Sequence, residues 1–330
     1  MGNMEFGIEL MPNLRVHELE YYARLSEESG FRYLWVTDHY NNRNAFVVLS
    51  ALVRCTSNIK VGVGITNPFH MNPAVISSAI ATIDEMSGGR AVLGIGAGDL
   101  FTLRSIGIER RKPLKRVGEA IYIIRKLLNG ETVNFDGEIF KFRGAKLSFK
   151  SRCVPIYVGA QRERMVRLAS DIGDGLILNA SHPKDVEFAL KNVELREGFD
   201  FAVCSSFSID KSRERAIQNA KVVVAFIVSS SPPEVLERHG IDYESVRSVS
   251  LALRDAFESG NWRCVVDVVS DEMVEEFSIS GTIDDVIERI ESLEKLGVTQ
   301  IVVGSPIGRE KSKVIRMIGD QIIPHFQKGD

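Results

Sequence analysis

The first hundred residues repeat one pattern of hydrophobic and polar positions. Each repeat has a short apolar or β-branched run, a polar or glycine-rich turn, and a segment with apolar residues at helical spacing. The short runs start roughly 30 residues apart, which leaves room for one strand and one helix in each repeat. The pattern predicts strands at Glu5–Leu10, Tyr33–Thr37, Lys60–Ile65 and Ala91–Gly96, with helices at Val16–Ser29, Ala45–Cys55 and Pro73–Ser87.

The remaining chain continues this pattern but interrupts it twice. After a predicted helix at Pro113–Leu128, residues 130–150 are polar and aromatic and contain the turn Phe135-Asp136-Gly137, so we expect an insertion that could form a small hairpin. Residues 231–276 predict a second, helical insertion. Outside them we expect strands at Ile156–Val158, Gly175–Leu178, Phe201–Ile209 and Gln300–Val303, and helices from near Arg162, at Ala216–Val228 and at about Ile283–Leu296.

These segments make eight strands of the parallel type, each followed by helical sequence. Alternating strands and helices favour a parallel sheet covered by helices, and eight such units favour a closed (β/α)8 barrel. The alternative, an open doubly wound sheet, usually has a GxGxxG turn after its first strand, and this chain has Glu9-Leu10-Met11-Pro12-Asn13 there. We therefore predict one α/β domain over residues 1–330, a TIM-like barrel with the two insertions.

Composition narrows the class of protein further. The chain has 330 residues, a net charge of −3 and no basic stripe, so we expect no nucleic-acid partner. We find no signal peptide and no apolar run of membrane-spanning length, so we expect a cytoplasmic protein that does not bind membranes. The four cysteines lack metal-ligand spacing, and the six histidines form no HxxxH or HxH pair, so we expect no metal site.

Small and polar residues occur at the predicted end of every strand. In a barrel these ends surround the active site, so their co-occurrence points to a ligand. Each also has a purely structural explanation: Asp38 could cap a turn, Asp99 could cap a helix, and glycines serve tight turns. Glu9 could pair with a lysine, and His39 could bond within the rim. Gly159-Ala160-Gln161 precedes a predicted helix whose N-terminal N–H groups would suit a phosphate or carboxylate.

Several of these segments carry a family resemblance. The chain resembles the bacterial-luciferase-like superfamily and, within it, the coenzyme F420-dependent 5,10-methylenetetrahydromethanopterin reductases of archaea. The resemblance spans nearly the whole chain, and TDHYNN and SPIG are its most specific motifs. The matching segments are Phe6–Glu9, Thr37–Asn42, Gly64–Pro68, Gly94–Asp99, Tyr157–Gln161, Asn179–Ser181, Val223–Ile227, Ser231–Pro233, Glu237–Gly240 and Gly304–Gly308.

The resemblance implies a barrel that binds coenzyme F420, an 8-hydroxy-5-deazaflavin, and a non-prolyl cis peptide at Gly64–Ile65 in a bulge against the deazaflavin ring. Ala97 departs from the family pattern, which has proline there. A homo-oligomer is also implied, with the insertion after Ser231 as a candidate interface. The cofactor-binding residues that we expect are Asp38, His39, Gly64, Ile65, Thr66, Asn67, Ala97, Gly98, Gly159, Ala160, Gln161, Asn179 and Ser181.

The activity implied is hydride transfer between reduced F420 and the methylene group of methylenetetrahydromethanopterin, giving methyl-tetrahydromethanopterin. The pterin must first accept a proton, and a carboxylic acid with a raised pKa could supply it. Glu9 is the first candidate for this acid and Asp99 the second. Two alternatives are another F420- or FMN-dependent luciferase-like oxidoreductase and a non-catalytic flavin-binding barrel.

Overall fold

A computed structural model describes residues 4–327 of the chain, which form two compact units. The N-terminal unit comprises Gly7–Leu178 and Asn192–Ala202. The C-terminal unit comprises Asn179–Lys191 and, within the described part of the chain, residues 203–327 and 4–6. That the whole chain makes one domain stays a prediction. None of the described helices is both long and apolar enough to cross a bilayer.

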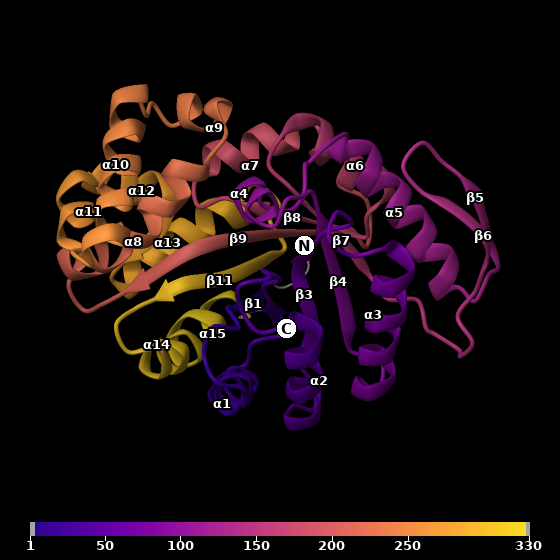
Figure 1. Ribbon diagram of the computed structural model, residues 1–330. Coiled ribbons are helices and arrows are strands. Elements are labelled where there is room, and N and C mark those ends of the chain that lie inside the picture. Colours follow the sequence, from indigo (N-terminus) through magenta and orange to yellow (C-terminus); the bar gives the residue numbers. More distant parts are fainter. Residues whose placement is uncertain (1–3, 328–330) are drawn as a thin grey trace. The chain divides into compact units, whose positions relative to one another are not determined.

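The N-terminal unit contains a parallel sheet with the strands in chain order (Figure 1). All four residues of β2 and all six of β4 are buried, as is typical of parallel strands that are covered on both faces. Its ladder pairs Leu10 with Val36 and Gly96 with Gly159, so the carboxyl ends of these strands lie along one edge. The strands are β1 (Glu5–Leu10), β2 (Tyr33–Val36), β3 (Lys60–Thr66), β4 (Ala91–Gly96), β7 (Ile156–Ala160) and β8 (Gly175–Asn179).

The helices of this unit, apart from the short one at Leu100–Ser105, form a row in which each packs against the next. Their ends follow local chemistry: Asn72 caps the third helix, Pro73 occupies its first turn, and Gly88 ends it in the left-handed conformation at φ 72°. Figure 1 shows the second and third helices outside the strands. The helices are α1 (Val16–Glu28), α2 (Ala45–Cys55), α3 (Pro73–Ser87), α4 (Leu100–Ser105), α5 (Pro113–Leu128) and α6 (Glu163–Ile172).

The first predicted insertion is a hairpin, as expected. Its strands β5 (Val133–Asp136) and β6 (Lys141–Ala145) pair antiparallel. The buried carboxylate of Glu119, on α5, accepts the backbone N–H groups of Glu138, Ile139 and Phe140 at 2.9–3.0 Å. One side chain thus holds the hairpin turn against its helix.

The C-terminal unit has a three-stranded sheet in the order β10-β9-β11. The strands are β9 (Asp200–Ile209), β10 (Ser278–Gly281) and β11 (Gln300–Ile307), and the sequence pattern missed the four-residue β10. The helices are α7 (Pro183–Leu190), α8 (Arg213–Ser230), α9 (Pro233–Arg238), α10 (Tyr243–Ser259), α11 (Arg263–Val268), α12 (Asp271–Phe277), α13 (Ile283–Glu294), α14 (Lys311–Met317) and α15 (Ile323–Phe326), with a π-helical turn at Ile318–Ile322.

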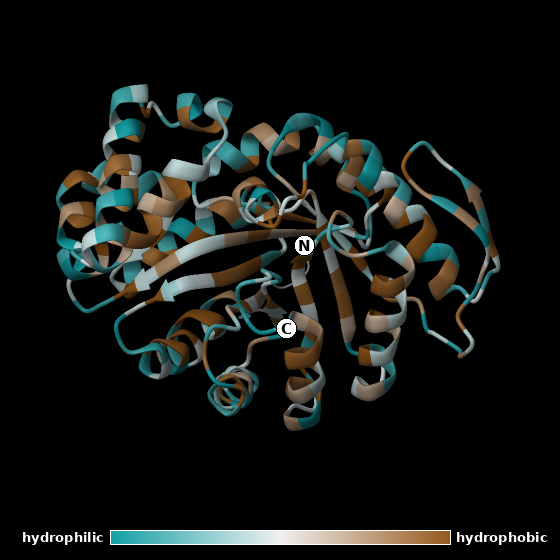
Figure 2. Ribbon diagram, viewed as in Figure 1, coloured by the Kyte–Doolittle hydropathy of each residue, from teal (hydrophilic) through white to brown (hydrophobic). Residues whose placement is uncertain are grey.

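The second predicted insertion is helical, as expected, and consists of α9 to α12. These helices share a hydrophobic core with α8, in which Val224, Val249, Val265 and Val274 are fully buried. Figure 2 shows apolar residues alternating with polar ones along these helices. Burial of each such side chain contributes about 1.5–3 kcal/mol relative to its exposure, so this shared core holds the insertion to α8.

Candidate active site at the strand ends

Strand β3 ends in the backbone feature that the resemblance implied. The Gly64–Ile65 peptide is cis, and the pairing of β3 with β4 shifts between Val63 and Thr66, which marks a bulge. The side chain of Ile65 lies over glycines of the neighbouring strands. A Cβ at Gly96 or at Gly159 would stand 2.4 Å from Ile65 Cδ1, so a side chain at either position would displace the end of the Ile65 side chain. The cis peptide is confirmed; its contact with a ring stays a prediction.

The carboxylate of Asp38, which follows β2, is held by two neighbours. Thr66 donates its hydroxyl to Asp38 Oδ2 at 2.7 Å, and His70 Nε2 lies 3.2 Å from the same oxygen. Only 6% of the Asp38 side chain is exposed. Burial by itself raises the pKa of Asp38, but the bonds from His70 and Thr66 outweigh it and lower the pKa. Asp38 is therefore a fixed negative charge at the strand ends.

Asn67 locks the loop after β3 against the loop after β4. Its amide oxygen accepts the backbone N–H groups of Phe69 and His70 at 3.1 and 3.3 Å. Gly98 adopts φ 68°, and a Cβ there would stand 2.8 Å from Asn67 Cγ. Arg110 donates to the Gly98 carbonyl at 2.9 Å and holds the other side of the turn. The amide oxygen of Asn67 thus organises the loop, and its amide nitrogen is the part that could meet a ligand.

The two candidate acids have different surroundings. Asp99 is the N-cap of α4: its Oδ1 accepts from the Thr102 N–H at 2.7 Å and from the Thr102 hydroxyl at 2.6 Å. Burial raises the pKa of Asp99, but the Thr102 bonds and the charge of His39 lower it further than burial raises it. Glu9 is half-buried within β1, opposite Trp35 of β2. A lowered pKa suits a charged Asp99 and leaves Glu9 as the better candidate for the proton donor.

The Gly159-Ala160-Gln161 segment forms the end of β7 and the approach to α6. Among the described residues, α6 has no side-chain hydrogen bond at its N-cap, Arg162. N–H groups at a helix N-terminus attract anions because of the helix dipole and their unused donors. That this segment meets the phosphate end of a cofactor stays a prediction.

Asn179 ends strand β8 and Ser181 follows it, and both residues belong to the C-terminal unit. Ser181 is 4% exposed, and its hydroxyl lies 2.5 Å from that of Ser205 on β9. The Ser181 carbonyl accepts from Arg289 Nη1 at 3.0 Å. The loop that carries these two predicted residues is therefore anchored by strand β9 and helix α13.

Sequence patterns missed the residues that support the site. His70, Arg110 and Arg289 each bond to a candidate residue or to its backbone, yet none occupies a strand end. Only Asn67, three residues before His70, hinted at a structured turn there. A group of possible metal ligands was also missed, because His182, His239 and Glu276 are far apart in the sequence and their ligand atoms lie within 4.8 Å of one another.

The strand ends could hold a flat, neutral ring. Gly96 and Gly159 leave room for the side chain of Ile65. The buried Thr37 hydroxyl has no hydrogen-bond partner among the described residues. An unsatisfied buried hydroxyl is rare in proteins and indicates a missing partner. The acceptor Asp38, together with His39 and Asn67, suits a polar ring edge.

Comparison with known proteins decides the family. A family model described as luciferase-like monooxygenase matches residues 4–300. The chain belongs to this family. The 5,10-methylenetetrahydromethanopterin reductase of Archaeoglobus fulgidus is 55% identical over 332 residues, which cover 98% of this chain and 100% of the relative. The resemblance inferred from the motifs is confirmed.

Solved structures confirm the fold class. The coenzyme F420-dependent tetrahydromethanopterin reductase from Methanopyrus kandleri superposes with a TM-score of 0.89 at 39% identity, covering 98% of this chain and 100% of that one. An F420-dependent secondary alcohol dehydrogenase matches with a TM-score of 0.78 at 20% identity, covering 97% and 98% of the two chains, and so shows the fold alone. This luciferase-like chain is an α/β protein with the TIM-like (β/α)8 barrel fold.

Proposed function

We propose that this chain is an F420-dependent methylenetetrahydromethanopterin reductase, an oxidoreductase that produces methyl-tetrahydromethanopterin. The observation that carries the proposal is 55% identity with the Archaeoglobus fulgidus reductase over 98% of this chain and 100% of that protein. The cis peptide, the glycines around Ile65 and the two acids at the strand ends support it. The likeness to the alcohol dehydrogenase lies at the level of the fold, so it favours no second substrate.

Within this function, the residues that we expect to bind the cofactor have different tasks. Asp38, His39, Thr66 and Asn67 hold the ring edge, with Gly64, Ile65, Ala97 and Gly98 beside it. Gly159, Ala160 and Gln161 meet the phosphate end at the N-terminus of α6. Asn179 and Ser181 are the further cofactor-binding residues that we expect.

Reduced F420, when bound, supplies a hydride. The protein's own chemical task is to move a proton and to stabilise charge. Glu9 holds the proton that the pterin nitrogen needs, and general acid help of this kind is worth about 10²–10⁴ in rate. Asp99 stays ionised through the Thr102 bonds and offsets the positive charge that develops on the pterin. The strand ends orient the two reactants, which converts an encounter into a reaction within one complex.

A turnover assay tests the function. Purified protein is mixed with reduced F420 and methylenetetrahydromethanopterin, and the oxidation of F420 is followed by its absorbance. We expect oxidation that depends on both compounds, with methyl-tetrahydromethanopterin as product. Reduced FMN or NADPH in place of F420 serves as the control. Equal turnover with FMN, or F420 binding without turnover, would support one of the two alternatives instead.

Two further expectations belong to the same proposal. A cluster of partly exposed aromatic side chains on α8, α10 and α11, formed by Phe226, Phe257 and Trp262, favours a homo-oligomer that uses the helical insertion. Light scattering on the wild type and on Phe257→Ser tests it: the wild type is expected to be larger than one chain and the variant smaller. We also propose a cytoplasmic location, which fractionation of native cells would test.

A further inference from the structure

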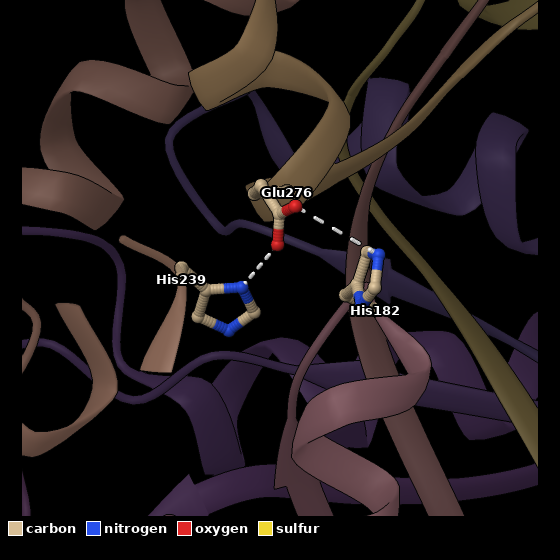
Figure 3. A group of neighbouring side chains, drawn as sticks. All are labelled: His182, His239 and Glu276. Atoms are coloured by element: carbon tan, nitrogen blue, oxygen red, sulfur yellow. Dashed lines mark hydrogen bonds and ion pairs between the residues drawn. The ribbon is translucent and has the colours of Figure 1, made fainter. Parts of the chain in front are cut away.

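The ring of His239, just after α9, is enclosed by two carboxylates of the C-terminal unit. Its side chain is fully buried, and Nδ1 lies 2.5 Å from Glu276 Oε2 on α12 (Figure 3). Nε2 lies 3.0 Å from both oxygens of Asp185 on α7. An ionised carboxylate accepts hydrogen bonds and cannot donate them, so both ring nitrogens must carry a proton. The geometry thus requires a buried imidazolium.

The surrounding charges are arranged to keep this imidazolium. Burial lowers the pKa of His239, but its bonds and charge attraction to Asp185 and Glu276 raise it more, and the net shift is upward. Arg238 also binds Asp185 at 2.6 Å, and Lys184 binds both oxygens of Glu276 at 2.8 and 3.0 Å. The groups that face His239 or its partners are Asp185, Lys184 and His182 from the α7 end, Arg238 from α9, Glu276 from α12 and Arg289 from α13.

The residues around His239 include the start of helix α7. Lys184 and Asp185 belong to the first turn of α7, and His182 is the N-cap of that helix. His182 Nδ1 accepts the backbone N–H of Lys184 at 3.2 Å. Directly before this turn come Ser181 and Asn179, which the proposed function assigns to the cofactor. The insertion therefore contacts the helical turn that fixes where these two residues lie.

We propose that His239 is a positioning residue: through Asp185 and Glu276 it ties the helical insertion to the first turn of α7 and so sets the Asn179–Ser181 loop for the anionic end of the cofactor. The inference rests on the proposed function, because it takes the loop to be part of the F420 site. It gives the insertion a role in cofactor affinity, separate from the proton chemistry at Glu9.

A divalent metal ion is the competing occupant of the cluster. His182, His239 and Glu276 offer three ligand atoms, and Asp185 contacts the other ring nitrogen of His239, as a carboxylate often does behind a metal-bound histidine. Two contacts oppose it. His182 Nδ1 accepts a backbone N–H, which places the ring proton on Nε2, the nitrogen that would bind the metal. The ammonium of Lys184 already pairs with Glu276. The ion pairs therefore describe the cluster better than a metal does.

The test compares F420 affinity in the wild type and in His239→Gln, by quenching of F420 fluorescence. The substitution removes the charge and one of the two bonded nitrogens, so we expect the Kd for F420 to rise on the order of tenfold, with kcat at saturating F420 within about twofold of wild type. The matched control is Lys221→Met, which breaks the 2.9 Å ion pair between α8 and Asp271 of α12. It should lower the Tm and leave the Kd unchanged.

The pH dependence separates positioning from a general loss of stability. Since the pKa of His239 is raised by folding, its contribution is complete below the ordinary pKa of histidine and is lost as pH rises through the raised value. Wild-type affinity for F420 should therefore weaken across that upper range, whereas His239→Gln should lack this step. If His239→Gln does not fold, Glu276→Gln takes its place, and ¹⁵N NMR of wild-type His239 should show both ring nitrogens protonated at neutral pH.

Three results would overturn the inference. The first is that the wild type and His239→Gln bind F420 with equal affinity. This result would leave the proposed function intact. The second is a loss of F420 affinity on treatment with EDTA, or one equivalent of bound Zn²⁺ that His239→Gln loses, either of which makes the cluster a metal site. The third is a wild-type protein that does not bind F420, which overturns the proposed function as well.

Discussion

Polar groups are organised in different ways at the strand ends of the N-terminal unit and in the α7 cluster of the C-terminal unit. The α7 cluster consists of His239, Asp185 and Glu276. At the strand ends, near neighbours and backbone set the geometry, as where Asn67 packs against Gly98 or Thr102 holds Asp99. In the α7 cluster, charged side chains from helices far apart in the sequence meet around His239. The difference matches the two roles that we propose: proton transfer at the strand ends, and positioning of the Asn179–Ser181 loop by the residues around His239.

The largest expected effect is that of Glu9→Gln. Because the amide cannot supply the proton, kcat should fall on the order of 10²–10⁴-fold, while the Kd for F420 stays within about twofold. Steady-state kinetics and fluorescence quenching measure the two. Asp99→Asn is the comparison, with a smaller expected loss. Full activity of Glu9→Gln, or a larger loss in Asp99→Asn, would reassign the acid.

Gly94→Ala should disturb the strand ends through the backbone. The new Cβ would stand 2.5 Å from the Val63 carbonyl oxygen and 2.9 Å from Ile65 Cγ2, beside the bulge. Overpacking of this kind costs about 1–3 kcal/mol, so both the free energy of unfolding and the F420 affinity should decrease. Gly118→Ala is the control. Gly118 lies within helix α5, and a Cβ there would have its nearest contact at 3.7 Å, from Leu168 Cδ1. Alanine in place of glycine within a helix should stabilise the fold by about 0.5–1 kcal/mol. Urea unfolding of both variants checks the pair.

Asp38→Asn should change the response to acid. Because the pKa of Asp38 is lowered by folding, its carboxylate stabilises the fold above the ordinary pKa of aspartate, and this contribution is lost as pH falls through the lowered value. Asparagine should cost about 1–3 kcal/mol at neutral pH, since His70 and Thr66 lose an ionised acceptor. The unfolding free energy measured from neutral to acid pH should fall less in the variant. An unchanged acid response would show that Asp38 is not held as a charge.

The smallest effect on stability is expected at the helix cap formed by Asp99. Asp99→Ala removes the N-cap of α4 and should cost about 1 kcal/mol. Asn44→Ala removes the N-cap of α2 at the same expected cost. Thermal unfolding should show similar losses, whereas kcat should fall only in Asp99→Ala. An equal kcat in the two variants would reduce Asp99 to a cap.

Local patterns were enough to predict most of the fold. The bounds of β1, β4, α2, α3 and α5 agree with the sequence analysis because each element buries a continuous apolar stripe or run. Short elements were missed: α4 has six residues and β10 has four, too few for a period to stand out.

The candidate site divides in the same way. Residues at strand ends such as Asp38 and Asp99 could be found because topology alone brings them to one edge. His70 lies in a loop and contacts Asp38, and Glu276 contacts His239 within the helical insertion. Neither pair is close in the sequence, so no local sequence pattern predicts either contact. Tertiary packing brings such supporting residues together, and a single sequence does not contain the information that predicts these contacts.

In the proposed function, Glu9 protonates the pterin at the strand ends. A crystal structure with F420 and methylenetetrahydromethanopterin bound would show which acid contacts the pterin. We expect the deazaflavin ring against the Gly64–Ile65 bulge and the Glu9 carboxyl within hydrogen-bonding distance of a nitrogen of the pterin's methylene bridge. A ring bound elsewhere, or a bridge nitrogen that contacts Asp99 in place of Glu9, would contradict the account.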